Sequence, residues 1–211
     1  MNKQYFMVFL LAVLSTVSSN AQTSFGAGFG FNSFYIQSVD EEKFVSAEYI
    51  SRWGNQFSIM GEKAFNDVWA THVAILYSWQ FTLNYITRLE TCMDYVKIQP
   101  MVKYSGFSPD WMKRMSVKGG IYYGYATRGS IRDYTGVDDE DIKLKPGKDN
   151  CIKKASDFGL AAEVGFQIKR VQVGVFAQAG FLNTSNVKGL TETNLGWGVH
   201  ATYLFFNKNR H

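Results

Sequence analysis

Apolar and polar side chains alternate along most of the chain with a period of two, which is typical of β-strands rather than helices. The clearest example is a pair of 11-residue segments, 158–168 and 171–181, that are separated only by Lys169 and Arg170. This spacing predicts a tight hairpin. Its strands are long compared with the ~5–6 residues that are usual in soluble proteins.

The same alternation predicts six further strands, eight in total, near residues 25–31, 57–62, 68–81, 95–105, 115–125 and 195–205. Pro100 interrupts the strand predicted at 95–105. Because proline has no N–H group to donate to a neighbouring strand, we expect a β-bulge at this position.

The connections between the predicted strands alternate in length. Short turns are expected at 66–67, 106–113 and 169–170, and longer loops at 38–54, 82–91, 128–156 and 183–193. This alternation is typical of a barrel that crosses an outer membrane, with both termini on the short-turn, periplasmic side. The predicted fold class is therefore all-β, an eight-stranded antiparallel up-and-down transmembrane β-barrel.

The period of two alone does not decide whether the apolar face points outward, into lipid, or inward, as in a soluble secreted barrel. The polar face combines many glycines with titratable residues, which suits a narrow lumen better than a solvated surface. We therefore predict a polar network inside the barrel, formed by Glu62, His72, Lys97, Lys103, Lys118, Glu163 and His200.

Aromatic residues on the apolar face also favour the membrane. Trp69 and Trp79 lie ten residues apart on the same face of one predicted strand. In a tilted strand this separation is roughly 23 Å along the membrane normal, close to the ~25 Å apolar band between the aromatic girdles of outer-membrane barrels. We assign both tryptophans to the girdles, together with Trp197 and Tyr203 of the last strand. A soluble secreted lipid-binding barrel remains an alternative.

The N-terminus has the pattern of a signal peptide over residues 1–21. Lys3 precedes the apolar stretch 5–14, and the segment Ser19-Asn20-Ala21 fits the small-x-small rule for cleavage. The apolar stretch is too short to span ~30 Å of hydrocarbon as a helix. We expect an exported chain whose single domain, the outer-membrane barrel, covers residues 22–211.

Composition narrows the choice of function class. Apolar residues make up 46% of the chain and charged residues 19%, which excludes an intrinsically disordered protein. The formal net charge is +4, and the basic residues are dispersed among acidic ones, so we expect no nucleic-acid partner.

The two cysteines, Cys92 and Cys151, both fall on the long-loop side of the predicted barrel. In an oxidising compartment this favours a disulfide between them, with two free thiols as the alternative. The cysteines and the distant histidines have no metal-ligand spacing, so we expect neither a metal nor a cofactor.

Several segments carry a family resemblance, namely 157–160, 163–166, 171–186, 195–199 and the glycines Gly26, Gly28 and Gly30. With them the chain resembles the small outer-membrane barrel proteins of Bacteroidetes, often grouped as PorT-like, whose eight-stranded barrels have the size of OmpA and OmpX. The resemblance implies a fold and a location more than an activity, and one branch of the family is tied to a protein-secretion apparatus. Such barrels often end on an aromatic residue, which the assembly machinery reads, whereas here residues 207–211 follow Phe206.

No catalytic residue is predicted. His72 and His200 share the lumen face with Glu62 and Glu163, but neither histidine has a serine motif around it. An eight-stranded barrel also leaves no substrate-sized channel. We expect a structural or interaction module with extracellular loops. Its expected partners are outer-membrane lipid and lipopolysaccharide, the barrel-assembly machinery during insertion, and an envelope protein. The alternatives are a subunit of an envelope or secretion complex and a lipid-modifying enzyme.

Overall fold

The computed structural model describes residues 23–40, 49–84, 88–108, 112–133, 141–148 and 151–207. The signal peptide expected at residues 1–21 lies outside this part of the chain. The described residues form nine strands: β1 (Thr23–Asp40), β2 (Tyr49–Ala64), β3 (Trp69–Asn84), β4 (Leu89–Tyr104), β5 (Met115–Asp133), β6 (Ile142–Leu144), β7 (Ser156–Ile168), β8 (Val171–Gly180) and β9 (Leu190–Asn207).

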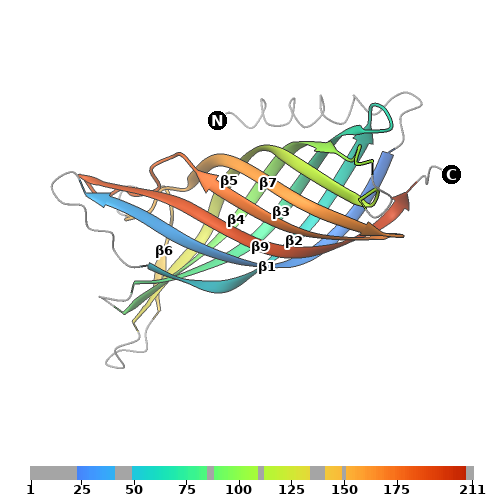
Figure 1. Ribbon diagram of the computed structural model, residues 1–211. Coiled ribbons are helices and arrows are strands. Elements are labelled where there is room, and N and C mark those ends of the chain that lie inside the picture. The colour runs from blue at the N-terminus through green and yellow to red at the C-terminus, as the bar shows by residue number, and fades with distance from the viewer. Residues whose placement is uncertain are drawn as a thin grey trace.

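Eight of these strands form a closed ring, as predicted. Each strand pairs antiparallel with its neighbour in the order β4-β3-β2-β1-β9-β8-β7-β5, and pairing between β4 and β5 closes the ring. Figure 1 shows that the start of β1 and the end of β9 lie at one end of the barrel, which we name the turn end. The opposite end is the loop end.

The apolar face of the strands points outward. On the hairpin of β7 and β8, outward side chains such as Leu160, Val164 and Val175 are about half exposed, whereas inward Glu163 and Phe176 are buried. The interior therefore holds charged and amide side chains together with apolar ones such as Met60 and Leu76, whereas the outer face is largely apolar. In the part of the chain that the structure describes, no helix has the length and hydropathy needed to cross a membrane.

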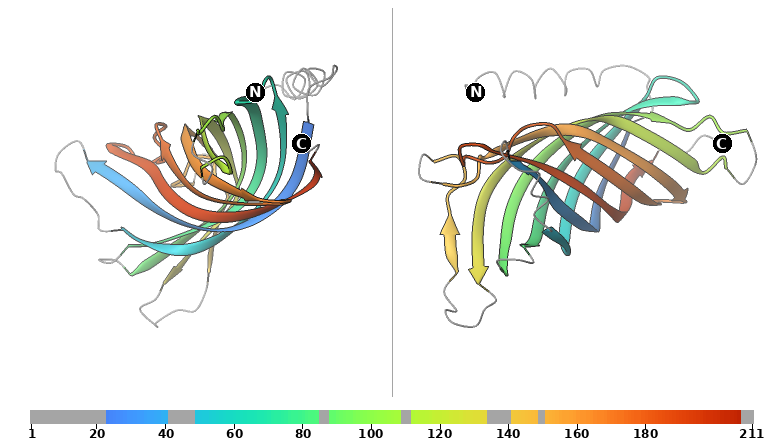
Figure 2. Two further views of the ribbon diagram at one scale, coloured as in Figure 1. Left: turned by 45° about the vertical axis from the view of Figure 1, so that its right-hand side comes forward. Right: turned by 60° about the vertical axis from the view of Figure 1, so that its left-hand side comes forward.

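The strands are longer than the apolar pattern predicts, especially toward the loop end. The loop expected at 38–54 shrinks because β1 continues to Asp40 and β2 begins at Tyr49. The loop expected at 128–156 contains the end of β5 and the short strand β6, which pairs with residues 129–131. Figure 2 shows β5 and β6 projecting beyond the ring. Backbone pairing continues there after the apolar alternation has ended.

The β-bulge expected at Pro100 is not found. Pro100 pairs with Val73 of β3 in an unbroken register. On the other side, the ladder to β5 skips Gln99 and Pro100 and resumes in the same register at Met101. The missing N–H group therefore interrupts the pairing locally without adding a residue. The register shifts lie instead between Phe25 and Gly26, Arg52 and Gln56, and Asp94 and Tyr95.

Candidate functional site: the barrel interior

Six of the seven residues predicted for the lumen lie in one connected group, which we name the ion-pair network: Glu62 of β2, His72 of β3, Lys103 of β4, Lys118 of β5, Glu163 of β7 and His200 of β9. The inward alternation of six different strands brings these side chains together. Each strand contributes a single member, so the network cross-links almost the whole ring.

Glu62 is the centre of one half of the network. Lys103 Nζ donates to Glu62 Oε2 at 2.7 Å, and His72 Nδ1 lies 3.1 Å from Glu62 Oε1. Lys118 Nζ lies 3.7 Å from the same Oε1 atom and joins this half to the other. The carboxylate is thus surrounded by three nitrogen groups from three other strands.

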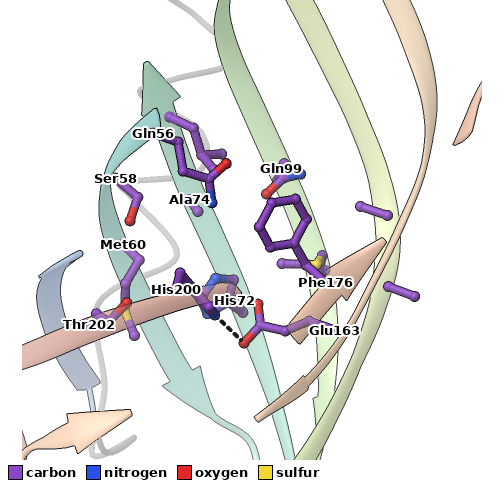
Figure 3. A pocket seen from close by; sticks show the side chains of 14 residues that line it. Gln56, Ser58, Met60, His72, Ala74, Gln99, Glu163, Phe176, His200 and Thr202 are labelled. Carbon is purple, nitrogen blue, oxygen red and sulfur yellow. Dashed lines mark ion pairs between the residues drawn. The ribbon is translucent and has the colours of Figure 1, made fainter. Parts of the chain in front are cut away.

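Glu163 is the centre of the second half. Lys118 Nζ donates to Glu163 Oε1 at 2.9 Å, and His200 Nε2 lies 3.0 Å from that oxygen. A dashed line in Figure 3 marks the pair of His200 and Glu163. Lys118 is only 1% exposed. A buried charge is costly unless it is paired, and the network pairs its two lysines with its two glutamates.

Lys97 lies apart from the network, although it shares the lumen. Its Nζ donates to Gln178 Oε1 at 2.7 Å. The same atom lies near three aromatic rings, 4.3 Å from the centroid of Phe34, 4.9 Å from that of Tyr122 and 5.5 Å from that of Tyr95. Cation–π contacts of this kind stabilise a desolvated ammonium. Among the described residues, no carboxylate lies at ion-pair distance from Lys97, which is held by an amide and by aromatic rings.

The sequence analysis did not predict the buried Asp157 as a lumen residue. Asp157 is fully buried, and its Oδ2 accepts hydrogen bonds at 3.0 Å from Tyr122 Oη and from Asn194 Nδ2. Asp157 precedes the predicted strand 158–168 by one residue and shares the parity of Glu163. That parity was the available signal, and extending the strand by one residue would have found it.

At the loop end, two segments that the sequence analysis treated as loops contact each other and contain buried side chains. Lys153, in the segment after β6, pairs with Ser185 in an isolated β-bridge. Its Nζ donates to Glu192 Oε2 at 2.6 Å, and both side chains are buried. These residues lie in two predicted loops, where no periodicity indicates burial.

Above the ion-pair network the interior is filled with side chains. A cavity of about 20 Å³ lies in the middle of the barrel, lined by residues that include Ser58, His72, Phe176 and His200. A second cavity, nearer the loop end, has about 10 Å³. Each is comparable with the space that one water molecule needs. At the turn end, by contrast, the lumen opens into a cavity of about 670 Å³.

The four residues assigned to the girdles lie on the outer surface. Trp197 contacts Trp53, and Trp79 contacts Phe57 and Tyr77, all toward the loop end. Toward the turn end, Trp69 contacts Tyr104 and Tyr203 contacts Phe205. Trp53, which is 60% exposed, was missed because the sequence placed it in a loop.

The disulfide favoured by the sequence is not formed in the structure, and Cys92 and Cys151 are both free thiols. Cys92 lies on the outward side of β4, in line with Val96 and Val102. Cys151 is buried beyond β6, where its carbonyl oxygen accepts a hydrogen bond from Asn186. Cys92 thus lies in a strand of the ring, whereas Cys151 lies in the segment between β6 and β7.

Polar chemistry outside the lumen is modest. Arg132 donates to both carboxylate oxygens of Asp141, at 2.8 and 3.0 Å, beside β6. These hydrogen bonds lower the pKa of the Asp141 carboxyl. Among the described residues, no group of three or more histidine, cysteine or acidic side chains is placed to hold a metal ion.

Comparison with protein-family models and with curated proteins finds no match. Among solved structures, the chain is similar to Ail, the attachment invasion locus protein of Yersinia pestis, at 10% identity and a TM-score of 0.46, covering 89% of this chain and 100% of Ail. It is also similar to the outer membrane protein AlkL, at 14% identity and a TM-score of 0.44, covering 92% of this chain and 95% of AlkL. It is similar as well to Neisserial surface protein A, at 15% identity and a TM-score of 0.43, covering 86% of this chain and 98% of that protein. Likeness at this level concerns the fold alone.

Proposed function

We propose that this chain is an outer-membrane β-barrel protein that serves as a structural and interaction module, with its loop end outside the cell. The observation that carries the proposal is that the barrel is apolar on the outside and carries charged side chains on the inside. Apolar side chains cover the outside between two belts of aromatic residues, while the charged side chains are paired inside. This is the arrangement that a hydrocarbon surrounding favours.

The outer surface supports membrane insertion in detail. Phe29, Ile59 and Val175 are exposed between the levels of the two aromatic belts. In water such a continuous apolar surface would cause association. In a membrane the same side chains contact lipid hydrocarbon instead of water. The signal peptide expected at residues 1–21 and the PorT-like resemblance are consistent parts of the same proposal.

The interior favours a module without enzymatic activity. Ser58, His72 and His200 line the same cavity, but its volume of about 20 Å³ leaves no room for a lipid or sugar substrate. His72 Nδ1 is paired with Glu62, and His200 Nε2 is paired with Glu163. A nucleophile needs a base within hydrogen-bond reach and access to substrate. We therefore assign the network to stability.

The loop end is the surface that can meet partners. Exposed basic residues gather there, among them Arg88, Lys143, Lys145, Lys148 and Lys188. Cationic side chains near the outer leaflet attract lipid phosphates, and this supports lipopolysaccharide as a partner. An envelope protein that binds the same loops is the second partner we propose.

Heat-modifiability tests the proposed location. Protein extracted from outer-membrane fractions should migrate at different apparent masses in SDS gels before and after boiling, because a closed membrane barrel resists cold SDS. The soluble periplasmic fraction should contain little of it. Recovery in the soluble fraction, without a mobility shift, would contradict the proposal.

A further inference from the structure

A hollow at the turn end, larger than the two interior cavities, has no role in the proposed function. It has about 670 Å³, within the ~300–1,000 Å³ typical of small-molecule sites. Its floor includes Glu62 and Lys103 of the ion-pair network, and its rim includes the turn at residues 66–68 and the segments 113–116 and 167–169. We name this hollow the vestibule.

The floor of the vestibule is electrically balanced. Lys103 and Glu62 form the 2.7 Å ion pair, and Lys103 is 8% exposed. Immediately behind them, Lys118 is paired with Glu163. Because these lysines and glutamates cancel one another, the charge of the vestibule is set by its rim.

The rim is positively charged. Lys113, Arg114 and Lys169 are exposed there, against one acidic residue, Asp67. Lys113 and Asp67 each take part in other interactions. The side chains of Arg114 and Lys169 form no ion pair with any residue that the structure describes. They are the cations that remain to attract a ligand.

Gln167 fixes the positions of these two residues. Its backbone N–H donates to the carbonyl oxygen of Arg114 at 2.9 Å, which ties β7 to the start of β5. Its side-chain Nε2 donates to the carbonyl oxygen of Lys169 at 3.1 Å. Lys169 itself has a φ of 53°, in the tight turn between β7 and β8. Gln167 therefore holds the backbones of both Arg114 and Lys169.

We propose that the vestibule is a binding site for an anionic group of the carboxylate or phosphate class. The proposal rests on the orientation in the proposed function, which places the turn end in the periplasm, so the ligand comes from that side. Arg114 can bind either group through two parallel hydrogen bonds, and Lys169 adds a second positive charge.

The test uses the purified full-length barrel in detergent micelles, labelled with ¹⁵N and titrated at low salt with two probes, inorganic phosphate and glutarate. Saturable shifts of the backbone amides of Arg114, Gln167 and Lys169 are expected with at least one probe. The probe that binds more tightly identifies the source as phosphate or carboxylate. The double variant R114Q/K169Q should weaken binding at least tenfold.

The matched control removes the same charge from the opposite end of the barrel. The variant R128Q/K154Q should bind within twofold of the parent chain, because Arg128 of β5 and Lys154 of the segment after β6 both lie toward the loop end. Equal weakening in both variants, or no saturable shift with either probe, would overturn the vestibule proposal. The unboiled gel shift is measured on the same preparations. If the gel shift persists while the probes do not bind, only the vestibule proposal is contradicted. If the gel shift is absent, the proposed membrane barrel is contradicted as well.

Discussion

At the scale of single residues, the ion-pair network depends on pairing each lysine with a glutamate. Glu163 receives Lys118 at 2.9 Å and His200 at 3.0 Å, and Lys118 is 3.7 Å from its second partner, Glu62. Removing one partner from such a buried group leaves a charge that neither water nor a counter-ion can stabilise. The network should therefore respond to a change of one carboxylate more strongly than any surface pair.

We expect Glu163→Gln to lower the free energy of unfolding by about 2–4 kcal/mol, because a buried lysine loses its nearer carboxylate while keeping the more distant one. Guanidinium unfolding in lipid vesicles, followed by tryptophan fluorescence, measures the change. Asp141→Asn is the matched control, since it breaks the exposed pair with Arg132 and should change stability little. Adding Lys118→Met to Glu163→Gln should restore part of the loss. Equal effects of Glu163→Gln and Asp141→Asn would show that the network is not stabilising.

At the scale of strands, the success of the sequence analysis followed the apolar alternation. The strands predicted at 158–168 and 171–181 agree with β7 and β8 to within two residues at each end. The strand predicted at 57–62 is a fragment of β2, which begins at Tyr49. The register shift between Arg52 and Gln56 breaks the alternation there. The three residues of β6 are too few to show any period.

The candidate site was predictable to the same degree and for the same reason. Parity alone put the six members of the ion-pair network on the lumen face, but it could not say which of them touch. Those contacts depend on how strands far apart in sequence are staggered around the ring. The vestibule has no sequence signal at all, because its rim comes from turns in which Arg114 and Lys169 show no pattern.

Glycines in the strands provide a second prediction at this scale. A Cβ added at Gly159 of β7 would collide with the carbonyl oxygen of Ala179 in β8. We expect Gly159→Ala to reduce the folded fraction strongly, because backbone atoms of a paired strand cannot move aside. Gly119 of β5 is the control, since a Cβ there would meet no atom within 4 Å. Gly119→Ala should be neutral or stabilise by about 0.4–1 kcal/mol. Unboiled SDS gels of refolded protein measure both, and equal folded fractions would contradict the close approach.

At the scale of the whole molecule, the outside of the barrel should report its surroundings by depth. On β8, Val175 and Val171 point outward on the same face, four residues apart. Val175 pairs with Val199, which lies between the levels of Trp197 and Tyr203 on β9, whereas Val171 pairs with Tyr203 itself. If lipid surrounds the barrel, Val175 therefore lies near the middle of the bilayer and Val171 near its periplasmic surface.

This difference in depth predicts unequal effects of one substitution at the two sites. Val175→Lys should cost about 2–4 kcal/mol of stability in lipid vesicles, and Val171→Lys about 0–1 kcal/mol, because a lysine near the surface can extend its ammonium into water. Guanidinium unfolding from vesicles measures both. Repeating it with vesicles of shorter acyl chains should reduce the cost at Val175, since a thinner bilayer brings water closer. A barrel surrounded by water has no depth, so small and equal effects of the two substitutions would contradict membrane insertion.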